Sequence, residues 1–193
     1  MAGHVRYTAL LDACVLYPLA MTDALMSLAT AGLYAAKWTT RIEQEWIRSL
    51  ERQRPELVGR LTIRRDSMRE AVPDWEVPES AWASLVSGIV LPDLDDVHVL
   101  AAAIAGHTDC IVTSNLKDFP EEVLQPYGIE AIDPDTFIVN QWELDPVRVI
   151  TAFKHMRARR RKPSAGPEEF AYALEVGGLP ATAERLRVAA ELI

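Results

Sequence analysis

Acidic residues follow or flank the apolar segments of this sequence, at positions where they could act together. Asp12 closes an apolar, strand-like run over residues 7–11, and Asp118 follows a second such run over residues 110–114. Glu45 lies on the flank of the apolar stripe of a predicted helix. Because an isolated buried carboxylate is costly, we expect a compensating positive charge near these three acids.

Three more acids, Asp93, Asp95 and Asp96, stand at the start of an apolar helical run over residues 97–105. The helix macrodipole favours acids at its N-terminus by roughly 0.3–1 kcal/mol each. Capping therefore accounts for Asp93 as the cap and for Asp96 as its partner three residues later. Three acids within four residues exceed what capping requires, so this cluster is a candidate for binding.

These acids together predict a cation site. The carboxyl ends of parallel strands form a crevice in open α/β sheets, and carboxylates gathered there repel each other unless cations lie between them. Because the sequence has no His or Cys cluster of metal-ligand spacing, the oxygen ligands favour a hard cation, Mg²⁺ or Mn²⁺. Such ions suit in-line hydrolysis of a phosphodiester. For each acid taken alone, a structural role at a cap or loop stays open.

The order of the predicted elements is typical of an α/β fold. Strand-like runs are found at residues 7–11, 36–39, 110–114 and 129–132. They alternate with helical segments of crossover length, which indicates a parallel sheet covered on both faces. Thr22 is expected to cap the first long helix, and Thr40 with Glu43 forms a capping-box signature for the next. We expect one domain over residues 1–142 and a helical C-terminal extension over residues 143–193.

The extension carries a basic stretch inside an acidic chain. Six bases fall within nine residues without an acid: Lys154, Arg157, Arg159, Arg160, Arg161 and Lys162. A helix end is complemented by cations, yet six exceed that need. The net charge of −8 argues against general adhesion to nucleic acid, whereas a concentrated basic stretch can still bind a phosphate backbone locally.

Targeting features are not evident in the sequence. No apolar run approaches the roughly 20 residues that cross a bilayer, and the first residues lead directly into a strand without a signal or transit peptide. Cys14 and Cys110 both lie in apolar, strand-like surroundings, which is typical of buried, reduced thiols. We therefore expect a cytoplasmic protein that does not contact a membrane.

Four segments in the same order resemble those of a known family. They are LLDACVL at 10–16, WTTRIEQE at 38–45, DLDDVHVLAAA at 93–103 and VTSNLKDF at 112–119. Each motif is weak alone, but over residues 7–141 the chain resembles the PIN-domain ribonucleases of VapC type, the toxins of bacterial VapBC toxin–antitoxin pairs.

The resemblance implies a three-layer α/β/α PIN-like fold with a short central parallel sheet, and Mg²⁺- or Mn²⁺-dependent endoribonuclease activity. It also implies an RNA substrate, a cognate antitoxin whose tail fills the active site, and a homodimer. Carried over by position, the residues that bind metal or catalyse are Asp12, Glu45, Asp96 and Asp118, with Asn115 beside Thr113 or Ser114 as a hydrogen-bonding group. Asp93 is a possible further ligand, and Asp95 is better explained as a cap. Cys14 departs from the family, since many relatives have Asn there. The resemblance does not cover the basic stretch, whose six bases exceed what a helix end needs and therefore favour contact with an RNA backbone or the antitoxin.

Other functions predict different residues. An aspartyl-phosphate phosphohydrolase usually needs a second Asp two residues after the first, where this chain has Cys14. A receiver-type phosphorylation module needs an acid pair near the first strand, and the acid pair here lies elsewhere. A PIN-like module that binds RNA or protein without cutting it stays open as the alternative. The sequence does not identify the RNA target.

Overall fold

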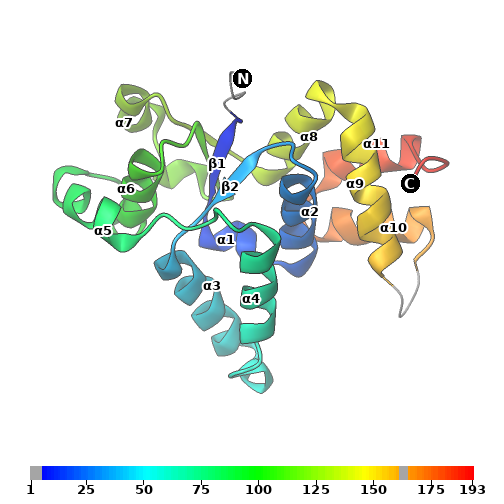
Figure 1. The fold of residues 1–193 in the computed structure, drawn as a ribbon, viewed down its shortest axis with the longest axis horizontal. Helices are drawn as coiled ribbons and strands as arrows, with labels where there is room; N and C mark the ends of the chain where they lie inside the picture. The colour runs from blue at the N-terminus through cyan, green and yellow to red at the C-terminus, as the bar shows by residue number, and fades with distance from the viewer. Residues whose placement is uncertain (1–5, 161–164) are drawn as a thin grey trace. The chain divides into compact units, whose positions relative to one another are not determined.

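A computed structural model describes residues 6–160 and 165–193 (Figure 1). Its centre is a sheet of four parallel strands in the order β2-β1-β3-β4. The strands are β1 (Thr8–Leu11), β2 (Ala35–Lys37), β3 (Cys110–Val112) and β4 (Glu130–Ile132). The short parallel sheet confirms the predicted α/β class, and each predicted strand is present within about two residues of its expected ends.

The two central strands are buried because helices and neighbouring strands cover them. Ala9, Leu10 and Leu11 of β1 are inaccessible to solvent, and so are all three residues of β3. Continuous apolar runs of this kind are typical of parallel strands that are covered on both faces. Leu11 pairs with Val112, so β1 and β3 end side by side. This register brings the residues that follow both strands to one edge of the sheet.

The contacts divide the chain into two compact units, and this division differs from the predicted boundary at residue 142. Unit 1 comprises Met1–Tyr17 and Tyr34–Asp133, and unit 2 comprises Pro18–Leu33 and Pro134–Ile193. The physical reason lies in one helix, α2 (Leu19–Thr30). It follows β1 in sequence but packs against α9 (Pro146–Arg159). The N-terminal part of the chain thus contributes a helix to the unit formed mainly by its C-terminal helices.

Unit 1 contains the sheet and the helices that connect its strands. Its helices are α1 (Ala13–Leu16), α3 (Thr40–Gln53), α4 (Thr62–Ala71), α5 (Glu79–Trp82), α6 (Val97–Ala105) and α7 (Glu121–Leu124). Short 3-10 helices cover Pro55–Leu57, Ala83–Gly88, Leu94–Asp96, Leu116–Asp118 and Gln125–Tyr127. The apolar α6 packs against β1 and β3, which makes it the main helical part of the core.

Unit 2 is helical in the residues that the structure describes. Besides α2 and α9 it holds α8 (Pro134–Leu144), α10 (Pro167–Val176) and α11 (Pro180–Val188). Asp145 caps α9, since its Oδ1 accepts a hydrogen bond from the Arg148 N–H at 3.0 Å. Asp135 joins α8 to α11, because its carboxylate accepts hydrogen bonds from the N–H groups of Ala181 and Thr182. The C-terminal helices therefore form one packed body, consistent with the predicted helical extension.

Two predicted caps are wrong. Helix α2 begins at Leu19, so Thr22 lies inside it and its hydroxyl donates to the carbonyl of Pro18 at 2.9 Å. The cap of α3 is Thr39, whose side chain accepts from the N–H of Ile42 at 3.1 Å. Glu43 is not a capping-box acid, because its carboxylate is buried and paired with Arg69 of α4. In both cases tertiary packing moved the helix start relative to the local signal.

Candidate active site

Asp12 is held in one orientation at the end of β1. Its backbone N–H continues the sheet by donating to the carbonyl of Val112 at 3.1 Å. One carboxylate oxygen accepts from the N–H of Ala13 at 2.5 Å, and the other accepts from the hydroxyl of Thr113 at 2.7 Å. Asp12 is only 4% exposed to solvent. Donors from the ends of both central strands thus fix a buried carboxylate at the sheet edge.

Cys14 adds a third donor to this carboxylate. Its Sγ lies 3.1 Å from Asp12 Oδ2 and accepts a hydrogen bond from the N–H of Ser114 at 3.2 Å. Burial, and then the charge of Asp12, raise the pKa of Cys14 from 9.0 to about 12. The group is therefore a thiol at neutral pH, and it can donate to Asp12 but is a poor nucleophile.

Several of the predicted site residues line one cleft in unit 1. The cleft has a volume of about 340 Å³, and four of its lining residues are Asp12, Glu45, Asp96 and Asn115. These residues come from four separate segments of the chain: the end of β1, helix α3, the start of α6 and the loop after β3. Tyr17 and Trp46 line the same cleft. The fold therefore brings together four of the five residues predicted to be catalytic, whose roles stay predictions.

The pKa of Asp96 shows the electrostatic character of this cleft. Partial burial is the main cause that raises the pKa of Asp96, from 3.8 to about 7. The negative charges of Asp12, Asp93, Asp118 and Glu45 add to this shift. Asp96 forms no ion pair with any residue that the structure describes. The cleft is consequently a place where negative charge is concentrated and where a cation would be stabilised.

The remaining predicted acids lie around the cleft rather than in its lining. Asp118 ends a 3-10 helix and does not line the cleft, although its charge acts on Asp96. Asp93 caps the 3-10 helix before α6, because its Oδ1 accepts from the N–H of Asp95 at 2.9 Å. The predicted capping role of Asp93 is thus confirmed. Asp95 is exposed and lines a second cleft of about 490 Å³ that shares Glu45 and Asp96 with the first.

His98 is a site residue that the sequence analysis missed. It lies on α6, its side chain is 1% exposed, and its Nε2 is 2.8 Å from Glu45 Oε1. Arg41 Nε approaches the same oxygen at 3.3 Å. Glu45 Oε2 accepts no hydrogen bond from the described residues. A signal that could have identified His98 from the sequence is that it is the lone polar residue in the apolar run VHVLAAAIA. A polar group buried in such a run needs a partner.

The donor chemistry of the cleft fits a divalent cation with few protein ligands. No group of three or more His, Cys, Asp or Glu side chains within residues 6–160 and 165–193 has the arrangement of a complete metal site. Mg²⁺ is usually bound by one or two carboxylates and keeps several waters, so it does not require such a group. Asp12 and Asp96, two mutually repelling carboxylates in one cleft, supply ligands of this type.

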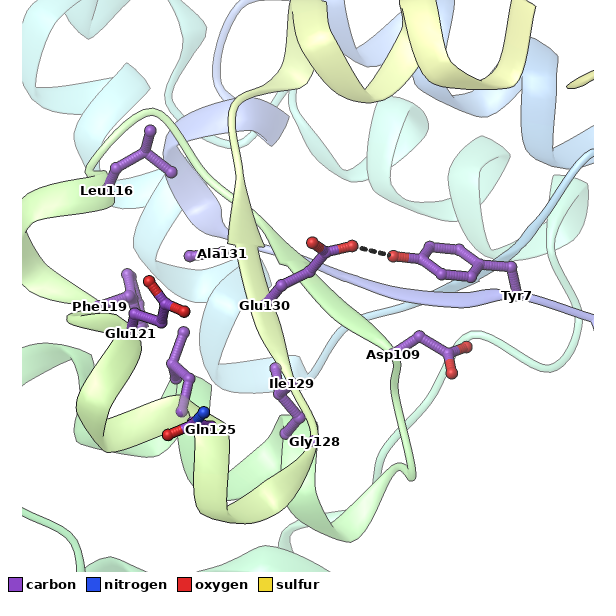
Figure 2. Close-up of a pocket in the computed structure, with 11 residues that line it drawn as sticks. Tyr7, Asp109, Leu116, Phe119, Glu121, Gln125, Gly128, Ile129, Glu130 and Ala131 are labelled. Atoms are coloured by element: carbon purple, nitrogen blue, oxygen red, sulfur yellow. Dashed lines mark hydrogen bonds between the residues drawn. The ribbon is translucent and has the colours of Figure 1, made fainter. Parts of the chain in front are cut away.

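A larger cleft in unit 1 has a different lining (Figure 2). It has a volume of about 720 Å³ and lies beside β4. Its acids include Asp109 and Glu130, and the hydroxyl of Tyr7 donates to Glu130 at 2.6 Å (Figure 2). Phe119 and Ile129 contribute apolar surface. Glu121 is a third acid of this lining, and neither Asp12, Glu45 nor Asp96 belongs to it. We therefore assign the candidate active site to the smaller one.

The described residues of the predicted RNA-binding stretch have different partners. Lys154 donates to the carbonyl of Leu192, and Arg157 donates to carbonyls of Ala165 and Ile193. Arg160 lies over the ring of Phe170. Arg159 pairs with Asp23 of α2. The other two predicted residues, Arg161 and Lys162, lie outside the described residues. The contacts of Lys154, Arg157 and Arg160 serve the packing of unit 2, and their binding role stays a prediction.

The chain is similar to a known toxin family in its C-terminal part. Residues 134–188 match a family model described as the VapC50 C-terminal domain. These limits coincide with the start of α8 and the end of α11. No helix in the described part of the chain is long and apolar enough to span a membrane.

A curated relative gives the same indication. The chain is 51% identical over 49 residues to "Putative ribonuclease VapC50" of Mycobacterium tuberculosis strain ATCC 25618 / H37Rv, which is 25% of this chain and 29% of that protein. No solved structure matches the chain. The two matches show that part of this chain is similar to VapC50, and the matched segment covers less than a third of that protein's length.

Proposed function

We propose that this protein is a metal-dependent endoribonuclease that hydrolyses RNA phosphodiester bonds and serves as the toxin of a toxin–antitoxin pair. The observation that carries the proposal is the cleft in which Asp12, Glu45 and Asp96 meet beside Asn115. Similarity to a protein named as a ribonuclease supports RNA as the substrate. The alternative is a PIN-like module that binds RNA or protein without cutting it.

Asp12 and Asp96 would hold Mg²⁺ or Mn²⁺, with Glu45, Asp118 and Asp93 as further ligands directly or through water. A bound divalent cation supplies a water of lowered pKa and neutralises negative charge on the phosphate during in-line displacement. The like charges around Asp96 favour this role, because they destabilise its carboxylate until a positive charge arrives. The chain itself provides no Lys or Arg ion pair to Asp96 among the described residues.

The residues behind the cleft position its carboxylates. Thr113 donates to Asp12 while its own hydroxyl oxygen accepts from the N–H of Asn115 at 3.0 Å. This chain of two hydrogen bonds couples the loop after β3 to the first acid. His98 holds Glu45 by Oε1, which leaves Oε2 for a ligand in the cleft. Asn115 would donate its side-chain amide to a phosphate oxygen, where hydrogen bonds orient the scissile group.

The partners follow from the proposed activity. RNA would bind as substrate, a cognate antitoxin would inhibit by occupying the cleft, and the toxin would act in the cytoplasm as a homodimer. The chain matches 29% of the length of its curated relative, so each partner is part of the proposal. Arg41 and Arg48 line the second cleft next to Glu45. These two side chains are suited to contact the substrate backbone beside the carboxylates.

The direct test is cleavage of a panel of labelled RNAs by the purified chain, with Mg²⁺, with Mn²⁺ and with EDTA. The variant Asp12→Asn/Asp96→Asn is compared with the matched control Asp66→Asn. Asp66 is 61% exposed, pairs with the neighbouring Arg65 and does not line the cleft. We expect metal-dependent cleavage by the wild type and the control, and at least about a 100-fold loss in the double variant, as for removal of a catalytic ligand shell.

Two outcomes would contradict this proposal in different ways. Equal cleavage by the wild type and the double variant would remove the assignment of the site. Cleavage that persists in EDTA would remove the metal dependence. If neither protein cuts any RNA but both bind it, the non-catalytic module is the better explanation.

A further inference from the structure

Unit 2 contains a pocket with a positively charged lining. It has a volume of about 290 Å³ and is formed by α2 and α9. Six of its eight lining residues are polar, namely Ser27, Thr30, Arg148, Thr151, His155 and Arg159, and the other two are alanines. No acid is among the described residues that line it. The lining combines guanidinium groups and hydroxyls, which are the groups that most often bind phosphate oxygens in proteins.

The spacing along α9 arranges the pocket residues in a row. Arg148, Thr151, His155 and Arg159 are three or four residues apart, so they share one face of the helix. Arg148 and Arg159 are eleven positions apart in the helix, which corresponds to roughly 16 Å at 1.5 Å per residue. The core side of α9 is formed by other residues, such as Val149 and Phe153. The four side chains of the row are exposed, so they are not part of the core of unit 2.

Contacts within unit 2 hold the two arginines at opposite ends of this row. Arg159 Nη2 donates to Asp23 Oδ1 at 2.9 Å and to Ser27 Oγ at 2.7 Å. Arg148 Nε lies 3.3 Å from Asp145 Oδ2, and its Nη1 donates to the carbonyl of Gly32 at 3.4 Å. The side chains of Arg148 and Arg159 are 52% and 55% exposed. Ion pairs this exposed are worth about 0–1 kcal/mol, so each guanidinium can exchange its acid for a phosphate.

The other described bases of the region differ from the row. Lys154 and Arg157 donate to carbonyl groups near the ends of other segments of unit 2, and Arg160 lies over Phe170. His155, by contrast, is exposed and has no partner among the described residues. The basic side chains that remain available therefore come from the row and not from the whole basic stretch.

We propose that this pocket binds phosphate groups of an RNA backbone. The inference rests on the proposed function only in taking RNA as the ligand. The planar guanidinium groups of Arg148 and Arg159 suit the oxygens of a phosphodiester, whereas the three hydroxyls of the lining already donate to carbonyls of their own helices. Arg148, His155 and Arg159 offer positive or protonatable groups along a length that spans several phosphates. Because the chain as a whole carries a net charge of −8, such a local contact would contribute most of its attraction to RNA.

The test is the binding of a fluorescently labelled single-stranded RNA to the full chain, followed by anisotropy in EDTA over a range of salt concentrations. The variant is Arg148→Gln/Arg159→Gln. The matched control is Arg60→Gln/Arg185→Gln, which removes the same charge at exposed or partly exposed positions outside the pocket. We expect at least about a tenfold weaker affinity for the pocket variant than for the control. The slope of log K against log salt should become shallower by about 1–2.

A second variant tests whether weaker RNA binding could result from a loss of folding. His155→Glu adds a negative charge to the pocket and removes no contact that the described residues make with His155. It should weaken RNA binding several-fold while the melting temperature stays that of the wild type.

The outcomes separate this inference from the proposed function. Equal affinity of the pocket variant and its control would overturn the pocket as an RNA site, and so would a wild type that binds no RNA. Polyglutamate and an unlabelled RNA of equal charge are compared as competitors. If polyglutamate displaces the labelled RNA equally well, the assignment of the pocket to phosphate is overturned. If the pocket variants lose RNA binding while the wild type cuts no RNA in Mg²⁺ or Mn²⁺, the pocket stands and the nuclease activity does not.

Discussion

Helix α3 carries two acids, Glu43 and Glu45, that lie in contrasting surroundings within unit 1. Glu43 is 2% exposed and receives hydrogen bonds from Arg69 and from the indole N–H of Trp38, both at 3.0 Å. Arg69 also lies over the ring of Trp75, with 4.7 Å between its Cζ and the ring centroid. Glu45 lines the cleft of Asp12 and Asp96, where partial burial and then the neighbouring negative charges raise the pKa of Asp96 to about 7.

The difference between Glu43 and the acids of the cleft shows how this chain stabilises a carboxylate that has only a structural role. At Glu43 the chain supplies its own cation, and the two groups join α3 to α4. Around Asp96 it brings several acids together and supplies no ion pair to Asp96 among the described residues. Like charges in one cleft are costly, and a stable protein retains them where a function requires the unbalanced charge. This contrast is the physical basis for proposing an external cation.

The largest effect on stability is expected at Glu43. Glu43→Ala leaves the guanidinium of Arg69, only 34% exposed, without its carboxylate. Breaking a buried pair by removing one partner costs about 3–5 kcal/mol, and we expect the lower part of this range. Urea unfolding with and without Mg²⁺ would measure it, with Asp66→Asn as the control. A loss below about 1 kcal/mol would show that the Arg69 pair is no stronger than a surface ion pair.

A smaller effect is expected for His98, seen in activity and metal dependence. His98→Ala frees the Glu45 carboxylate from its buried donor at 2.8 Å. Loss of a group that orients a metal ligand typically costs 10–100-fold in activity or metal affinity. The Mg²⁺ concentration for half-maximal cleavage should rise. His98→Gln, which retains a donor, should recover part of the loss. An unchanged Mg²⁺ requirement in His98→Ala, with reduced stability alone, would assign His98 to core packing.

The smallest effect concerns stabilisation by the cation itself. A ligand that binds only the folded state at ten times its Kd adds about 1.4 kcal/mol, which corresponds to a rise of about 3–6 °C for a chain of this size. We expect this rise for the wild type in Mg²⁺ or Mn²⁺ and none for Asp96→Asn.

In EDTA, Asp96→Asn should melt at or above the temperature of the wild type, because one of several repelling charges is gone. Two results together would contradict the proposed cation site: a melting temperature of Asp96→Asn in EDTA below that of the wild type, and a rise of that temperature when Mg²⁺ is added. Differential scanning calorimetry on both proteins would decide between these results.

Local sequence signals predicted the sheet well and the helix starts less well. The apolar runs that became β1 and β3 are buried from both faces, so hydrophobicity alone locates them. Thr22 and Thr40 carried the composition of caps, but α2 begins after Pro18 and the cap of α3 is Thr39. Glu43 fitted a capping box in sequence, yet Arg69, 26 residues later, takes its carboxylate. A long-range partner of this kind leaves no local signal.

The site shows the same division between local and long-range information. Asp12, Glu45 and Asp96 could be selected from the sequence because each stands beside an apolar segment at its end or flank. His98 could not, since its apolar surroundings in the sequence suggest a core residue, and its partner Glu45 lies on another helix. The basic stretch looked like one surface in sequence. Its described members have different partners, because residues 154–160 cover about two turns of helix and their side chains point in different directions around it.

The sequence by itself determined that acids would follow the buried strands, because continuous apolar runs locate these strands. Only the tertiary structure decided which carboxylates stay without a cation. Arg69 reaches Glu43 and no arginine reaches Asp96 among the described residues, and such pairings depend on how α3, α4 and α6 pack. Tertiary packing also decided that α2 joins α9 and so completes the basic pocket of unit 2. Charge balance is a property of neighbours in space, which the order of residues does not specify.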